Sequence, residues 1–125
     1  MRRLAVAVVS LAGLVSGCGG TDSGSDEGTP PVPCSAASAT ATTSVSIAGQ
    51  FLPFCVRISP GATVTFTNID YVDHAVSASA GQPESFESPL LQAGRQFTHT
   101  FAERAETVRV YCRIHPEMSA VIVVQ

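Results

Sequence analysis

The hydrophobic and polar positions of this chain of 125 residues predict β-structure for most of its length. From about residue 43 onward, apolar residues occur in short runs that Pro and Gly interrupt, and no run keeps a helical period. The clearest pattern is in residues 62–67, where Ala62, Val64 and Phe66 alternate with threonines, as in a strand with one buried face. The predicted strands are residues 43–48, 54–58, 62–67, 74–79, 95–101, 107–112 and 119–124.

The number and spacing of these strands indicate the fold class. Turn residues separate them at short intervals, most clearly at Ser59-Pro60-Gly61. Residues 81–94 contain two prolines and have a glycine at each end, so we expect an irregular connection there. An all-β chain of about seven to eight such strands predicts an antiparallel β-sandwich or barrel.

The first residues have the pattern of a secretory signal. Two arginines follow Met1, and residues 4–15 are almost wholly apolar, which is too short to span a bilayer comfortably. The small residues directly before Cys18 resemble the bacterial lipobox, which implies that Cys18 is lipidated and becomes the mature N-terminus. The alternative is ordinary signal cleavage with an incidental cysteine. Both interpretations predict export of the rest of the chain.

The next stretch is polar and predicts a tether. Residues 19–33 are Gly, Ser, Thr, Asp, Glu and Pro with almost no apolar residue, so they cannot bury enough surface to offset the entropy of ordering. The predicted organisation is a lipoprotein-type signal peptide at 1–17, a lipidated cysteine with a flexible linker at 18–41, and one folded domain at 42–125.

Composition changes this picture in one respect. The net charge is −3, and the seven basic residues do not form a patch, which argues against nucleic acid as a partner. A domain of about 90 residues is long enough to bury a modest core and fold alone.

The chemistry lies near the C-terminus, in residues 111–118. Cys112, His115 and Met118 place a thiol, an imidazole and a thioether within seven residues, between two predicted strands. A thioether adds little to a zinc site, whereas one Cys, two His and a long axial Met form the type 1 copper site of electron-transfer proteins. The second imidazole has to come from His74 or His99, the two other histidines.

The remaining cysteines are Cys34 and Cys55. If Cys18 carries lipid and Cys112 binds copper, these two are left as a disulfide pair, which export permits. The closed loop of about 20 residues would stabilise the domain by about 3 kcal/mol in the chain-entropy picture. Two alternatives stay open, namely that one of the pair is a metal ligand or that Cys112 pairs with one of them.

Three segments resemble the cupredoxins, the small blue copper proteins, and within them the amicyanin and plastocyanin type. Residues 61–70 followed by His74 are similar to the family's strand into its first histidine ligand. Residues 97–101 are similar to its penultimate hairpin, and residues 111–118 to its ligand loop, with the short amicyanin-type gap before Met118. The resemblance covers residues 43–125. It implies a Greek-key cupredoxin fold and one copper ion with the ligands His74, Cys112, His115 and Met118.

The resemblance leaves a few residues to be explained. His99 shares a face with Phe97 and Phe101 by alternation, so we expect it to be structural. Ala75 stands where the family often has Asn, so a hydrogen bond that tunes the thiolate is either missing or supplied from elsewhere. Asp73 beside His74 is either a hydrogen-bond acceptor for that imidazole or a solvated side chain.

The function that follows is one-electron transfer between redox partner proteins at the cell envelope. We expect a monomer that meets the membrane only through its lipid anchor. The alternative is a protein that sequesters or delivers copper. The chain lacks the paired His-x-His motifs of multicopper oxidases. A Cys112–His115 nucleophilic dyad would also need an orienting acid and a substrate pocket, and the sequence suggests neither. We therefore predict a protein that is not an enzyme.

Overall fold

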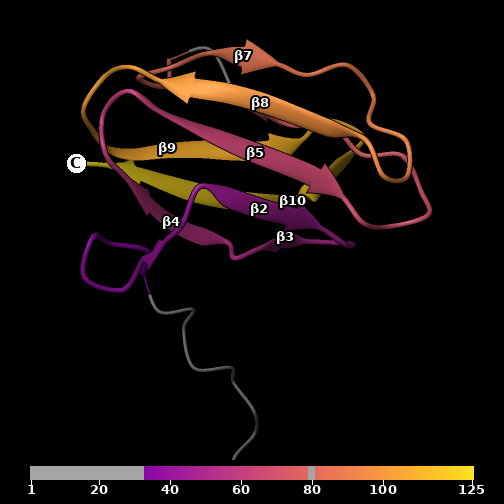
Figure 1. Ribbon diagram of the computed structural model, residues 1–125, viewed down its shortest axis with the longest axis horizontal. Coiled ribbons are helices and arrows are strands. Elements are labelled where there is room, and N and C mark those ends of the chain that lie inside the picture. Colours follow the sequence, from indigo (N-terminus) through magenta and orange to yellow (C-terminus); the bar gives the residue numbers. More distant parts are fainter. Residues whose placement is uncertain (1–32, 79–80) are drawn as a thin grey trace, which may run out of the picture.

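The computed structural model describes residues 33–78 and 81–125, and it places ten β-strands in two facing sheets (Figure 1). The predictions for the signal peptide, for Cys18 and for most of the linker lie outside the described residues. Within those residues, no helix is long and apolar enough to cross a membrane. The strands are β1 (Thr40–Ala41), β2 (Ser44–Ile47), β3 (Phe51–Leu52), β4 (Cys55–Ile58), β5 (Ala62–Asn68), β6 (Ser77–Ala78), β7 (Phe86–Glu87), β8 (Gln96–Phe101), β9 (Ala105–Cys112) and β10 (His115–Val124).

The two sheets confirm the predicted all-β sandwich but not its purely antiparallel pairing. One sheet has the order β1-β4-β10-β9-β6-β7 and the other β3-β2-β5-β8. Strand β4 pairs in parallel with both β1 and β10, and β2 pairs in parallel with β5, so the sheets are mixed. The reason is topological, because consecutive strands such as β4 and β5 lie in different sheets. The structure has ten strands instead of the predicted seven to eight. The additional strands are β1, β3 and β7, which have only two residues each and are too short to show a pattern in the sequence.

The core fills the space between the sheets. In β5 the residues Val64, Phe66 and Asn68 are buried, as the alternating pattern predicts for the first two. The ring of Phe66 meets Phe51 edge-on, with 6.3 Å between the ring centroids. Burying a large apolar side chain of this kind contributes about 1.5 to 3 kcal/mol. The antiparallel pair of β9 and β10 crosses the other side of the core and carries the ligand loop at its turn.

Cys34 and Cys55 form the predicted disulfide, which ties the segment before β1 to the start of β4. Cys112 is a free, buried cysteine. The two alternatives that the sequence left open, a metal ligand among the pair or a disulfide to Cys112, are therefore wrong.

His99 has the structural role that its position in β8 predicts. Its ring stacks on Phe86 with 4.0 Å between centroids, and it meets Phe101 edge-on at 4.8 Å. Its Nε2 bonds to the carboxylate of Glu84, whose other oxygen accepts the backbone N–H of Ala102 at 2.7 Å. These contacts fasten the connection after β6 to the end of β8.

A Glu84→Gln variant is expected to be about 1 kcal/mol less stable near pH 7 and to lose less stability in acid than the parent. Burial raises the pKa of the Glu84 carboxyl, but hydrogen bonds from His99 and from the N–H groups of Glu103 and Ala102 outweigh it, so the pKa lies below its usual value of 4.5. A lowered pKa contributes stability that is present above pH 4.5 and is lost as the pH falls through the folded-state pKa.

Urea unfolding of both proteins between pH 7 and pH 3 measures this difference. The gap between the parent and Glu84→Gln should narrow as the pH falls below about 4.5. A gap that stays constant or widens in acid would show that Glu84 is not held ionised in the folded state.

Candidate metal centre

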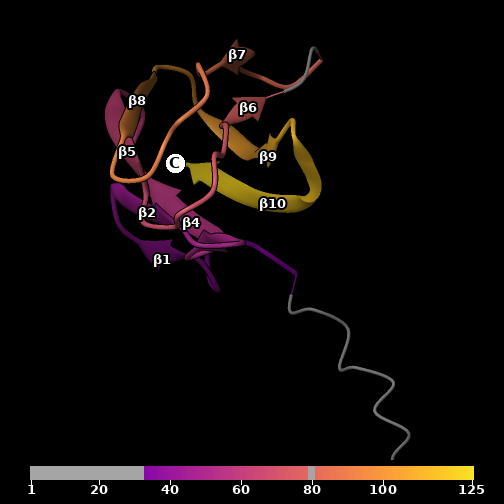
Figure 2. The same ribbon diagram turned by 90° about the vertical axis from the view of Figure 1, so that its right-hand side faces the viewer.

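Three potential metal ligands meet at one end of the sandwich. The ligand atoms of His74, Cys112 and His115 all lie within 4.8 Å of one another. His74 lies in the connection between β5 and β6, whereas Cys112 ends β9 and His115 begins β10. Figure 2 views the sandwich from the end where β5 and β9 terminate, which is the end of this cluster.

Cys112 is held in a dry position. Its side chain is fully buried, and its sulfur lies 3.7 Å from Nδ1 of His115. The backbone N–H of Ala75 donates to the same sulfur over 3.3 Å. A hydrogen bond to a ligand sulfur stabilises the thiolate, the form of cysteine that binds metals. The backbone of Ala75 thus supplies a hydrogen bond that its side chain cannot make.

The turn between β9 and β10 determines where His115 and Met118 lie. His115 is opposite Cys112 in the ladder, but the next aligned pair is Ser119 with Tyr111. Pro116, Glu117 and Met118 are therefore extra residues that bulge out of the pairing, and Pro116 has no N–H to offer it. This bulge brings the half-buried His115 ring next to His74, with 4.9 Å between their centroids.

His74 is fixed on three sides and leaves one nitrogen free. Its backbone N–H and C=O both pair with Leu91, over 3.1 and 2.7 Å. Nε2 lies 3.0 Å from the carboxylate of Asp70. Nδ1 is buried and has no hydrogen-bond partner among the described residues.

These contacts test whether a metal fits. The carboxylate of Asp70 requires the proton of His74 on Nε2, so Nδ1 carries the lone pair. A buried nitrogen lone pair without a hydrogen-bond partner costs free energy unless it coordinates a metal ion. Together with the nearby thiol and the second imidazole, this donor set suits a soft or borderline metal ion.

Asp70, and not Asp73, is the acidic partner of His74. The side chain of Asn68 stabilises the turn between Asp70 and His74. Its Oδ1 accepts the N–H of Asp70, and its Nδ2 donates to the carbonyls of Val72 and Leu91. Asp73 is exposed, so of its two predicted roles the solvated one agrees with the structure. The hydrogen bond with His74, followed by that from the N–H of Tyr71, holds the pKa of the Asp70 carboxyl below its usual value of 3.8.

An Asp70→Asn variant is expected to bind Cu(II) about 10- to 100-fold more weakly than the parent. The carboxylate of Asp70 accepts hydrogen bonds from both His74 and Tyr71, and an amide has only one oxygen to replace its two. Competition with a chelator of known affinity measures the change. Asp73→Asn is the matched control, and it should stay within about twofold of the parent because Asp73 is solvated. Equal losses in both variants would contradict the role given to Asp70.

Met118 lies in β10, three positions after His115, and is buried. Together with Phe51, Phe54 and residues 49, 50, 117 and 119 it lines a hollow on the surface. Its role as axial ligand stays a prediction.

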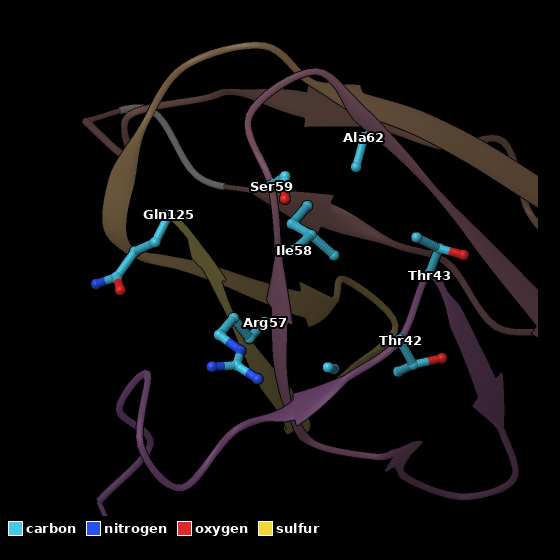
Figure 3. Close-up of a pocket in the computed structure, with 8 residues that line it drawn as sticks. Thr42, Thr43, Arg57, Ile58, Ser59, Ala62 and Gln125 are labelled. Carbon is cyan, nitrogen blue, oxygen red and sulfur yellow. The ribbon is translucent and has the colours of Figure 1, made fainter.

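A second hollow lies at the opposite end of the domain, where β10 ends (Figure 3). It contains none of the predicted ligands. Its lining residues are Ala41, Thr42, Thr43, Arg57, Ile58, Ser59, Ala62 and Gln125.

Solved structures similar to this chain include small cupredoxins and a copper-containing nitrite reductase. A purple cupredoxin from Nitrosopumilus maritimus is 28% identical with a TM-score of 0.60, over 69% of this chain and 100% of that one. An amicyanin variant in its reduced Cu(I) form is 28% identical with a TM-score of 0.63, over 75% of this chain and 92% of that one. A Cu-containing nitrite reductase from Thermus scotoductus SA-01 is 28% identical with a TM-score of 0.61, over 75% of this chain but 27% of that one. No family model and no curated protein matches the chain.

The fold of this protein is therefore the cupredoxin fold, with a potential metal site of two histidines and one cysteine. Among its structural neighbours, the amicyanins match it over most of their own length.

Proposed function

We propose that this protein is a type 1 copper protein that carries one electron at a time between redox partner proteins. The observation that carries the proposal is the cluster of His74, Cys112 and His115, with its buried and unpartnered Nδ1 on His74. Met118 completes the proposed ligand set as a weak axial thioether. Copper bound there would alternate between Cu(I) and Cu(II) and so hold or release one electron.

The protein supports such a role by keeping the ligands in place. His74 is fixed by Leu91 and Asp70, and Cys112 sits at the end of the longest antiparallel pair. Side chains held by packing and hydrogen bonds move little when the charge at the site changes, so little energy is spent on rearrangement. The burial of His74 and Cys112 also excludes water, which would otherwise solvate the charge of the bound copper.

Electrons need a route to the surface, and His115 offers one. It is the half-exposed member of the cluster. Exposed apolar residues occur on the connections around it, and Tyr71 is 91% exposed. Such residues favour docking of a partner through an apolar patch that desolvates on contact. The residues are Ile69, Tyr71, Val72, Leu90 and Ile114.

We further propose that the protein is exported and held at a bacterial cell envelope by lipid on Cys18. The apolar run in residues 4–15 and the small residues before Cys18 support this location. The linker was predicted at 18–41 and the domain at 42–125, but the structure bonds Cys34 to Cys55 and pairs β1 with β4, so in this proposal the linker ends before Cys34. The domain that follows is a monomer that swings on this linker to meet partners.

The test is whether bound copper cycles without leaving. The protein is loaded with one equivalent of Cu(II), reduced with ascorbate and reoxidised in the presence of a Cu(I) chelator. An electron carrier should regain its full absorption over repeated cycles and give a reversible one-electron wave in voltammetry. Transfer of the metal to the chelator on the first reduction would overturn the proposal and favour copper delivery.

A further inference from the structure

The segment from Ser88 to Leu91 contacts both parts of the metal centre, namely the chain around His74 and the turn that carries Cys112 and His115. On one side it is fixed to the chain around His74. Leu91 pairs with the backbone of His74, and Ser88 pairs with Val76, donating its N–H to the carbonyl and accepting the N–H of Val76 on its hydroxyl, both over 2.8 Å. The hydroxyl of Ser88 in turn donates to the carbonyl of Pro89 over 2.8 Å.

On the other side the same segment meets the ligand loop. Nη1 of Arg113 donates to the carbonyl oxygen of Ser88 over 2.7 Å. Arg113 directly follows Cys112 and lies two positions before His115, and its side chain is half-buried. Ser88 is 97% buried, so its carbonyl has little access to water as a substitute partner.

We propose that Arg113 is a positioning residue that clamps the turn carrying Cys112 and His115 to the side of the centre that carries His74. The inference rests on the proposed function, because it concerns the geometry of that same site.

This turn needs a further contact because the pairing between β9 and β10 is interrupted beside it. Residues 116–118 bulge out of the pairing between β9 and β10, so the strand pairing holds this turn only through the single pair of Cys112 and His115. Ala75 joins the two halves through its backbone N–H to the sulfur of Cys112, and its methyl group can add no second link. The hydrogen bond from Arg113 is charge-assisted and short, which makes it stronger than one between neutral groups.

The hydrogen bond from Arg113 to Ser88 does not depend on a metal, so the first test uses the metal-free protein. In Arg113→Ala we expect the amides of residues 112–115, 117 and 118 to exchange with deuterium on the order of tenfold faster than in the parent. Arg113→Lys keeps the charge but not the planar fork, and it should recover part of the protection. Arg95→Ala is the matched control, because Arg95 is an exposed arginine near the same end of the sandwich, beside Asn68 at the end of β5.

The second test uses the copper-loaded protein. Loss of the clamp should change the copper hyperfine splitting in the electron paramagnetic resonance spectrum and should slow electron self-exchange by about tenfold, since a looser turn rearranges more on oxidation. Arg95→Ala should leave both unchanged. The midpoint of urea unfolding of each variant shows whether the fold as a whole is intact.

The outcomes separate the clamp from the proposed function. Faster exchange confined to residues 112–118 in Arg113→Ala supports the clamp, even if the parent forms no blue copper site and the proposed function fails. Loop exchange, hyperfine splitting and self-exchange that match those of Arg95→Ala overturn it, and they do so even if the parent is a competent electron carrier. If Arg113→Ala does not fold, Arg113→Lys decides by the same measurements.

Discussion

A Cys112→Ser variant is expected to lose completely the intense blue absorption that we propose for the copper-loaded protein. That absorption comes from charge transfer between a thiolate sulfur and Cu(II), and a serine hydroxyl is a hard, protonated donor that cannot provide it. The substitution changes one atom in a fully buried side chain, and the N–H of Ala75 can still donate to the new oxygen. The fold should therefore survive, and the loss of colour should report on the ligand alone.

His99→Gln is the control for this experiment. His99 was the other imidazole available to the site, but it stacks on Phe86 and bonds to Glu84, away from the cluster. The colour of His99→Gln should match that of the parent at one equivalent of Cu(II). A parent protein that binds copper without colour, or a Cys112→Ser variant that stays blue, would contradict the assignment of Cys112 as a ligand.

The part of the site that the sequence reveals is the part that is local. Cys112, His115 and Met118 lie within one turn, so their spacing alone points to a soft metal. The choice of His74 over His99 came from the resemblance, since His74 is 38 positions from Cys112 and no local pattern connects them. The structure places the potential ligand atoms of His74, Cys112 and His115 within 4.8 Å of one another, which agrees with that choice.

The residues that the sequence does not reveal act through tertiary contacts, and such contacts leave no periodic pattern in the sequence. The choice between Asp70 and Asp73 depends on a turn that the buried side chain of Asn68 forms, and alternation predicts only that some side chain there is buried. The contact between Arg113 and Ser88 joins residues 25 apart, one of them in a segment that was expected to be irregular. Tertiary contacts of this kind depend on both partners at once, so neither can be inferred from its own neighbourhood.

The mixed pairing of the sheets has the same origin. Alternation within a strand indicates which face is buried but not the direction of the neighbouring strand. β1 and β10 both lie parallel to β4, although the paired residues are 16 positions apart along the chain for β1 and 66 for β10. Two-residue strands such as β7 are also too short to show an alternation.

Removing the disulfide by a Cys34→Ser, Cys55→Ser double substitution is expected to lower the free energy of unfolding by about 3 kcal/mol. The two cysteines are 21 positions apart, and closing a loop of that length restricts the unfolded chain. A loss of this size is a large share of the stability of a small domain and corresponds to a fall in melting temperature of roughly 12 to 24 °C. Thermal unfolding of the metal-free protein, with and without the substitutions, measures it.

The effect should be on stability and not on the metal centre. Cys55 aligns with Val121 in the sheet, six positions along β10 from His115 and three from Met118, and neither cysteine of the disulfide belongs to the cluster of His74, Cys112 and His115. The double variant is kept reduced so that Cys112 stays free, and the reductant is removed before Cu(II) is added. It should then take up copper with the spectrum of the parent at temperatures where it is folded. The matched control is the parent treated with the same reductant at a concentration that leaves its disulfide intact. An altered copper spectrum in the folded double variant would mean that the disulfide also shapes the site. An unchanged melting temperature would mean that contacts between β1, β4 and β10 already hold this edge of the sheet without it.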